Sequence, residues 1–280
     1  MAGESAGPEA IAAVCGFDPT MPNAARVYDY LLGGKDNFAA DRQAAEALLT
    51  ALPDAALAAR TNRAFLAEAV RRVAEQGVTQ FVDIGAGLPT APNVHDCARM
   101  VVPHARVVYV DNDPVVVTYA RALLAPDNLV TVISADARDH AAILGAPEFG
   151  SLIDLSKPVC VMFVSTLHFL PADQADAAVA AFRERMAPGS YLVISAGHND
   201  ERNIPVRDQV QAAYGRNMTL TGRTSAEIAA YFGDFELMPP GLVPLTEWPL
   251  DVPDGPHSPP RSTSSPAAAA VLAGIGRKLR

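Results

Sequence analysis

The chain has 280 residues and a mass of 29.5 kDa; 50% of its residues are hydrophobic and 19% are charged. This is the composition of a soluble protein with a packed core, and no uncharged stretch is long and apolar enough to span a bilayer. The net charge of -9 leads us to expect no nucleic-acid partner and no membrane partner. The three scattered cysteines lead us to expect a cytoplasmic protein without a metal site.

The first 77 residues are predicted to form a tail followed by helices. Residues 1–20 are rich in Ala, Gly and Glu and show little periodicity, which predicts disorder. The apolar spacing and the stop signals predict three helices, from Asn23 to Gly33-Gly34, over Asp41–Ala51 and over Thr61–Glu75. Residues 21–77 are therefore expected to form an N-terminal helical extension.

After residue 77, short β-branched runs alternate with helical segments. The predicted strands are Gln80–Ile84, Arg106–Val110, Leu129–Ile133, Val159–Val164 and Tyr191–Ser195. The predicted helices are Asn93–Val102, Pro114–Leu124, Arg138–Leu144 and Ala172–Met186. This alternation is typical of right-handed βαβ units, whose parallel sheet is covered on both faces. The sequence thus predicts an α/β fold, with one main domain over residues 78–280.

The end of the chain has a different pattern. A capping box at Thr224 begins a helix that runs to Phe232, and a short apolar run follows at Phe235–Met238. Residues 251–266 contain five prolines and four serines and predict a flexible, exposed loop. Ala267–Ile275 is predicted to return as a strand.

The candidate site follows the carboxyl ends of the predicted strands, where open parallel sheets bind ligands. The first strand leads into Gly85, Ala86 and Gly87, a turn in which the backbone can approach a ligand closely. The next three strands are followed by Asp111 and Asn112, by Asp136 and Ala137, and by Ser165. A carboxylate after the second strand can accept hydrogen bonds from both hydroxyls of a ribose.

Asp83, two residues before the first glycine, discriminates between two cofactors. A dinucleotide fingerprint places a third glycine where this chain has Thr90. A carboxylate at Asp83 would repel a pyrophosphate by about 4 kcal/mol at ~4 Å and an effective dielectric of about 20. S-adenosylmethionine has no pyrophosphate, and it offers an ammonium for Asp83, a ribose for Asp111 and an adenine amino group for Asp136. The pattern favours S-adenosylmethionine over NAD.

These residues also have purely structural interpretations. Gly85 and Gly87 could be ordinary turn residues, and Asp136 could close a turn. Asp111 or Asp113 could cap the helix that follows, an interpretation that we favour for Asp113 but not for Asp111.

From about Pro22 onward, the sequence resembles the S-adenosyl methyltransferase family of high-GC bacteria, long labelled as a domain of unknown function. The resemblance is carried by ARVYDYLLGGKDNFAADR at 25–42, by residues 81–93, by VYVDNDP at 108–114 and by Leu167-His168-Phe169. It implies a class I methyltransferase fold, which is a Rossmann-like sheet of seven strands. The last strand is antiparallel and lies between the fifth and sixth, a place that Ala267–Ile275 would take. The implied cofactor is S-adenosylmethionine.

Methyl transfer to a hydroxyl or an ammonium requires a base near the acceptor. His168, just after the fourth strand, is the candidate for this catalytic role. A buried histidine bonded to backbone is the alternative interpretation of His168. His198, after the fifth strand, is a weaker candidate.

The N-terminal segment adds candidates for a lid or a substrate contact, namely Tyr28, Tyr30, Lys35, Asn37 and Phe38. The segment could fold over a nucleoside site with Gly33-Gly34 as its joint, and aromatic rings would suit a sulfonium. Alternatively, the tyrosines pack the extension onto the sheet and Lys35 lies in a solvated turn. A solvated helix face is the expectation for Arg60, Arg63, Arg71 and Arg72.

The sequence therefore predicts an S-adenosylmethionine-dependent methyltransferase that acts on an unidentified small molecule; the oligomeric state is left open. The alternative is a regulator or sensor that binds S-adenosylmethionine or S-adenosylhomocysteine without methyl transfer. The support for this alternative is the lack of a motif. Amino-methylating enzymes place a proline-framed tetrapeptide after the fourth strand, and this chain has Ser165-Thr166-Leu167-His168 there instead. An NAD-dependent oxidoreductase is disfavoured by Asp83 and Thr90, and a nucleic-acid methyltransferase by the net negative charge.

Overall fold

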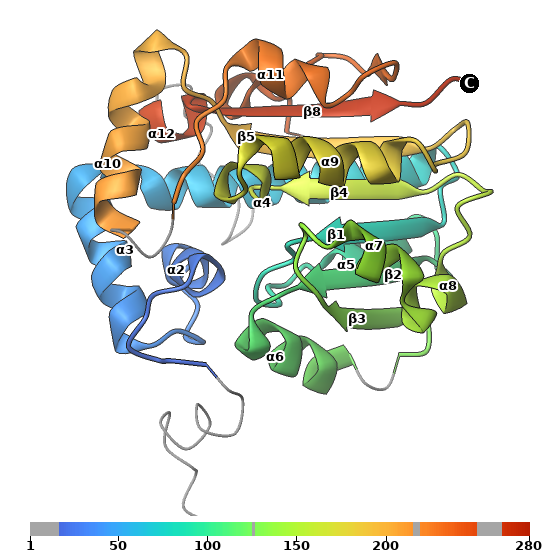
Figure 1. Ribbon diagram of the computed structural model, residues 1–280, viewed down its shortest axis with the longest axis horizontal. Coiled ribbons are helices and arrows are strands. Elements are labelled where there is room, and N and C mark those ends of the chain that lie inside the picture. The colour runs from blue at the N-terminus through green and yellow to red at the C-terminus, as the bar shows by residue number, and fades with distance from the viewer. Residues whose placement is uncertain (1–16, 125–126, 215–218, 251–264) are drawn as a thin grey trace, which may run out of the picture.

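The computed structural model describes residues 17–124, 127–214, 219–250 and 265–280 (Figure 1). Most of the predicted disordered tail (1–20) and of the predicted loop (251–266) lies outside these ranges. Residues 17–20 and 265–266 lie inside them. Thr20 donates hydrogen bonds to Asp18 in a turn, and Ser265 is buried at the start of a helix.

One sheet forms the centre of the fold, with the strand order β3-β2-β1-β4-β5-β8-β6 and the short β7 also paired to β8. The strands are β1 (Gln80–Ile84), β2 (Arg106–Asp111), β3 (Val130–Ser134), β4 (Cys160–Val164), β5 (Tyr191–Gly197), β6 (Glu236–Leu237), β7 (Val243–Pro244) and β8 (Val271–Arg277). β1 to β5 pair in parallel, and β8 runs antiparallel between β5 and β6. This confirms the predicted fold class, including the inserted last strand.

Helices cover both faces of the sheet. They are α2 (Ala24–Leu31), α3 (Ala39–Ala51), α4 (Ala55–Glu75), α5 (Val94–Arg99), α6 (Pro114–Leu124), α7 (His140–Gly145), α8 (Pro147–Leu152), α9 (Ala172–Arg183), α10 (Ile204–Tyr214), α11 (Ser225–Ala230) and α12 (Pro266–Ala269). Figure 1 shows α9 and α11 in front of the sheet and α4 behind it. Phe65 of α4 is buried on one face and Phe182 of α9 on the other, which explains why apolar residues predominate on both faces of the strands.

The predicted strand Ala267–Ile275 is wrong at its beginning. Pro266–Ala269 forms α12, because the Ser265 hydroxyl accepts a hydrogen bond from the Ala268 amide and Pro266 suits the first helical turn. Pairing with β5 begins only at Val271. The sequence also failed to predict α8, α10 and β7. In α10 only Tyr214 is buried, although Val206 and Val210 stand on the same face of the helix and pack against the same cluster.

Part of the extension stands at the carboxyl ends of the parallel strands. α2 and α3 pack with α10 around Val27, Leu31, Leu48 and Tyr214, whereas α4 packs on the sheet itself. Figure 1 shows α2, α3 and α10 together beside the tips of β1 to β4. The cover over the strand ends thus combines N-terminal helices with a helix from the second half of the chain. Within the described ranges, no helix combines the length and the apolar character needed to cross a membrane.

Gly33 and Gly34 form a fixed turn after α2 rather than a free joint. Gly33 has a φ of 85°, and a Cβ on Gly34 would overlap the carboxylate of Asp29. That carboxylate is held in place, because its Oδ2 accepts hydrogen bonds from the Asp36 amide and from Asn37 Nδ2.

We therefore expect Gly34→Ala to lower the free energy of unfolding by about 1–3 kcal/mol, the usual cost of overpacking. Urea denaturation checks this value. Gly145→Ala is the control, because a Cβ there meets nothing within 4 Å. Its free energy of unfolding should stay within ~0.5 kcal/mol of the wild type. Equal effects of the two substitutions would contradict the fixed turn.

Candidate active site

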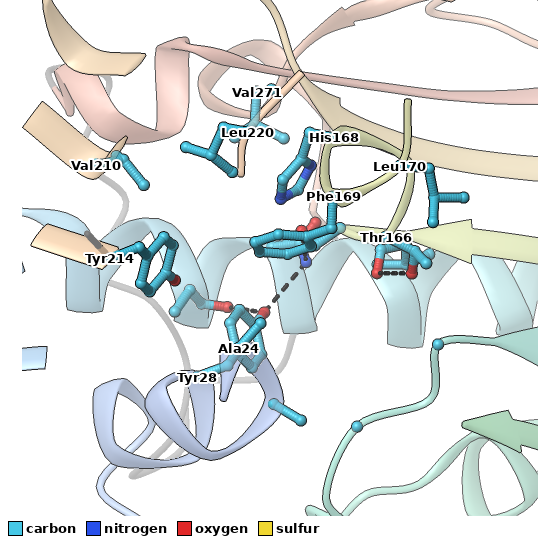
Figure 2. A pocket seen from close by; sticks show the side chains of 18 of the residues that line it. Ala24, Tyr28, Thr166, His168, Phe169, Leu170, Val210, Tyr214, Leu220 and Val271 are labelled. Atoms are coloured by element: carbon cyan, nitrogen blue, oxygen red, sulfur yellow. Dashed lines mark hydrogen bonds between the residues drawn. The ribbon is translucent and has the colours of Figure 1, made fainter. Parts of the chain in front are cut away.

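A cavity of about 520 Å³ opens at the carboxyl ends of the parallel strands. One part of it runs along the ends of β1 to β3, and the other lies between α2, α3 and α10. Figure 2 shows Tyr28, His168, Phe169 and Tyr214 around this second part. The predicted site residues that line the cavity are Tyr28, Asp83, Gly85, Ala86, Gly87, Asp111, Asn112, Asp136, Ala137, Ser165 and His168.

The structure does not bring Tyr30, Lys35, Asn37 or Phe38 to the cavity wall. The Tyr30 hydroxyl donates to a carboxylate on α3, and Lys35 is exposed. Asn37 Nδ2 donates to Asp29 at 2.8 Å, and Phe38 packs on another phenylalanine ring. Tyr30, Asn37 and Phe38 thus make contacts within the N-terminal extension, so the predicted contact with a ligand rests on Tyr28 alone.

The glycine turn keeps the backbone open to the cavity. Gly85 has a φ of 75°, and a Cβ there would lie 2.5 Å from Oγ1 of Thr166. Thr166 in turn donates a hydrogen bond to the carbonyl oxygen of Ile84 at 2.9 Å. Gly87 has a φ of 68°, and its Cβ would project into open space. Gly85 is thus required by packing, whereas Gly87 leaves room for a ligand.

Asp83 lies at the floor of the cavity and is only 4% exposed. No hydrogen bond to its carboxylate comes from any residue that the structure describes. Burial raises the pKa of Asp83 to about 7; the nearby Arg63 guanidinium opposes this rise and Asp111 adds to it. A buried carboxylate without a donor is satisfied by a ligand that brings one, and a cationic donor suits it best.

Arg63 brings a positive charge to the same part of the cavity. Its Nη2 donates hydrogen bonds to the carbonyl oxygens of Thr90 at 2.6 Å and of Pro92 at 2.8 Å. The prediction that Arg63 lies on a solvated helix face is wrong, whereas Arg71 does pair with glutamates along α4. Helical spacing alone could not reveal that this part of α4 passes over the glycine turn.

Asp111 and Asp113 have different roles. The Asp111 carboxylate accepts hydrogen bonds from the Gly87 and Asp113 amides, both at 2.9 Å, and it lines the cavity. Burial raises its pKa. Asp113 accepts a hydrogen bond from the Val115 amide at 2.7 Å and faces Arg26. Asp113 is therefore the helix cap that the sequence favours, and Asp111 is the carboxylate that a ligand can reach.

Asp136 belongs to a turn at the edge of the cavity. Its carboxylate accepts hydrogen bonds from Arg138 Nε at 2.8 Å and from Asn112 Nδ2 at 3.1 Å. The bonds from Arg138 are the main reason why the pKa of Asp136 falls to about 2. Asp136 therefore stays ionised at neutral pH, and its turn places Asn112 and Ala137 at the cavity wall.

Ser165 anchors the floor of the cavity between the two parts. It is the only non-glycine residue with positive φ (56°) in the described part of the chain. Asn62 Nδ2 donates to the Ser165 Oγ at 2.9 Å and to the Tyr28 hydroxyl at 3.1 Å. Ser195 Oγ donates to Asn62 Oδ1 at 2.7 Å. The hydrogen bonds of Asn62 thus connect α2, α4 and the ends of β4 and β5. No sequence motif predicts this role.

His168 lies in a 3₁₀ turn, Leu167–Phe169, after β4, and its ring is 4.4 Å from that of Phe169. Its Nδ1 is buried, and neither ring nitrogen has a hydrogen-bond partner among the described residues. The alternative interpretation, a ring bonded to backbone, is therefore wrong. Burial, aided by Arg223, lowers the pKa of His168 to about 4. The ring is neutral at pH 7 and can form a hydrogen bond with a ligand.

His198 also lines the cavity, but its ring is already engaged. Nδ1 lies 3.1 Å from Oδ2 of Asp200, and Nε2 lies 2.9 Å from Nδ2 of Asn203. His168 therefore remains the better candidate for contact with an acceptor. The described residues contain no cluster of three or more His, Cys, Asp or Glu side chains that could hold a metal ion.

The sheet order, with antiparallel β8 between β5 and β6, and the site at the strand ends are those of the class I, Rossmann-like methyltransferase fold. The chain belongs to the S-adenosyl methyltransferase family, whose model matches residues 12–279. This confirms the predicted family, the enzyme class and S-adenosylmethionine as the cofactor.

Two solved structures are similar over almost the whole chain. A candidate methyltransferase from Thermobifida fusca has 42% identity and a TM-score of 0.87, with 99% of this chain and 100% of that chain covered. A DUF574 family protein from Streptomyces avermitilis has 37% identity and a TM-score of 0.84, with 93% and 99% covered. No curated protein matches the chain.

Proposed function

We propose that the protein methylates a small molecule in the cytoplasm. The cofactor would lie along the ends of β1 to β3, in what we call the cofactor part of the cavity. The acceptor would lie between α2, α3 and α10, in the acceptor part. One observation carries this proposal. A single cavity joins the opposite charges of Asp83 and Arg63, beside a glycine turn, to a part with mostly apolar walls. The net charge of -9 favours a small molecule over a nucleic acid.

The residues of the cofactor part fit an amino acid joined to a nucleoside. Asp83 lacks a donor and would accept hydrogen bonds from the ammonium group, while Arg63 would bind the carboxylate. Asp111 would accept the ribose hydroxyls, and Asn112, with the turn at Asp136 and Ala137, would hold the adenine. Gly87 leaves the space that this approach requires.

S-adenosylmethionine supplies a methyl group that its sulfonium has already activated for transfer. Much of the catalysis can therefore come from positioning and from the exclusion of water. The helices α2, α3 and α10 cover the strand ends, and Asn62 ties this cover to Ser165 at the floor. His168, neutral and without a partner, would contact the nucleophile of the acceptor and take its proton.

Asp111→Asn tests the cofactor part. The variant keeps a side-chain oxygen for a backbone amide but loses the charge, so we expect S-adenosylhomocysteine to bind about 10–100-fold more weakly. Isothermal titration calorimetry measures the affinity. Asp139→Asn is the matched control, because Asp139 caps α7 away from the cavity, and its affinity should equal that of the wild type.

An unchanged affinity in Asp111→Asn would remove Asp111 from the site. The proposed function itself would fail if the wild type bound neither S-adenosylmethionine nor S-adenosylhomocysteine at high micromolar concentration but did bind NADH.

A further inference from the structure

We infer that the methyl acceptor is a planar aromatic molecule with a ring hydroxyl, held against Phe169 and Tyr214 with its hydroxyl at His168. This inference rests on the proposed function and deepens it by naming the class of acceptor. The structure supports it through the walls of the acceptor part, through the arrangement of the aromatic rings and through the chemistry of His168.

The walls of the acceptor part are mostly apolar. Leu48 comes from α3, Val210 from α10 and Leu220 from the segment after α10. Among the described lining residues between these helices, Arg207 is the one with a formal charge, and Asp208 already pairs with it at 2.6 Å. A zwitterionic or strongly charged acceptor would leave its own charges buried without partners here. An apolar molecule suits these walls.

Aromatic rings gather in the acceptor part. The centroid of Phe169 lies 6.0 Å from that of Tyr214 and 4.4 Å from that of His168, and both pairs are tilted. Figure 2 shows the Phe169 ring projecting between Tyr214 and His168. A further ring that packs edge-to-face or offset on such a group gains attraction beyond its buried area. The arrangement therefore favours a flat, aromatic acceptor over a saturated one.

The surroundings of His168 favour a phenol over an aliphatic alcohol. No carboxylate orients its ring among the described residues, and the nearby Arg223 opposes its protonation, so His168 is a weak base. A phenol, with a pKa of ~10, gives up its proton far more readily than an aliphatic alcohol, whose acidity is close to that of water at ~15.7. The phenolic oxygen bonds to the methyl carbon as the carbon–sulfur bond breaks. Sulfur keeps the bonding electrons, and the phenolic proton passes to His168.

The test compares two probes of the same skeleton, 2-naphthol and its saturated analogue decahydro-2-naphthol. Calorimetry measures the binding of each probe to the full chain, both with and without S-adenosylhomocysteine. We expect the wild type to bind 2-naphthol at least about tenfold more tightly than the saturated probe. Phe169→Leu should weaken 2-naphthol binding by about fivefold and change the affinity for the saturated probe little. Phe169→Tyr keeps the ring and should retain the wild-type affinity.

Binding of S-adenosylhomocysteine shows that each variant is folded. It also tests the proposed function independently of the inference about the acceptor. Equal binding of the two probes, or no binding of 2-naphthol, would overturn the aromatic class while normal S-adenosylhomocysteine binding still supported the methyltransferase. If Phe169→Leu lost S-adenosylhomocysteine binding, Val210→Arg on the opposite wall would replace it as the test variant. That substitution should remove 2-naphthol binding alone, and retained binding would count against the inference.

Discussion

Asp83→Asn is expected to weaken S-adenosylhomocysteine binding by about 10–100-fold at pH 7.5 and to abolish its pH dependence. In the wild type, burial raises the pKa of Asp83 to about 7, so the carboxyl group is largely protonated below that pH. The ammonium group of the ligand requires the ionised form and lowers the pKa in the complex. The affinity for S-adenosylhomocysteine is therefore highest above pH 7, where Asp83 is ionised. Below pH 7 it falls by about tenfold for each pH unit.

Calorimetry at pH 5.5, 6.5 and 7.5 measures this slope, and buffers of different ionisation enthalpy count the protons released on binding. 5′-Methylthioadenosine is the control ligand, because it lacks the amino-acid group. It should bind the wild type and Asp83→Asn with equal affinity, and that affinity should show no pH dependence caused by Asp83. A wild-type affinity for S-adenosylhomocysteine that is flat across this range would mean that Asp83 does not meet the ammonium group.

Arg26→Met is expected to lower the free energy of unfolding by about 3–5 kcal/mol, because two buried carboxylates lose their cation. Arg26 is 3% exposed. Its Nε donates to Asp41 Oδ2 at 2.9 Å, its Nη1 lies 3.3 Å from Asp113 Oδ2, and its Nη2 donates to a backbone carbonyl at 2.7 Å. The ion group fixes α2 and α3 to the start of α6. Because the Asp113 amide also donates to Asp111, the same substitution should weaken S-adenosylhomocysteine binding.

Urea denaturation measures the loss of stability. Lys157→Met is the control: Lys157 is 70% exposed and pairs with Asp154 on the surface, so the change should stay below ~1 kcal/mol. Adding Asp41→Asn to Arg26→Met removes one of the unpaired charges and should restore part of the lost stability. A loss below ~1 kcal/mol for Arg26→Met alone would show that the two carboxylates are satisfied without it.

The sheet and the residues at its strand ends could be predicted from the sequence because both leave local signals. Apolar β-branched runs indicate the strands, and Asp83, Gly87 and Asp111 follow from the position at which each run ends. Asn62 and Arg63 leave no such signal. They are polar positions on a helix, a pattern that equally describes a solvated face, and only the packing of α4 on the sheet brings them to the cavity.

The part of the cavity between α2, α3 and α10 was harder to predict for a related reason. Its walls come from helices far apart in the chain, and in α10 only Tyr214 of the apolar residues is buried. The run of alanines at 267–270 is compatible with a strand or a helix, and the buried Ser265 cap decides between them. Gly33-Gly34 suggested a joint, but the Asp29 carboxylate fixes that turn.

The position of β8 has a consequence for the biosynthesis of the protein. β8 fills an interior place between β5 and β6, although every other strand in the described ranges precedes it in the chain. During translation, one edge of β5 therefore has no partner until Val271–Arg277 has been synthesised. An open edge of this kind is a template for incorrect pairing. Until β8 takes its place between β5 and β6, the nascent polypeptide therefore has an edge at which aggregation can begin and which a chaperone could protect.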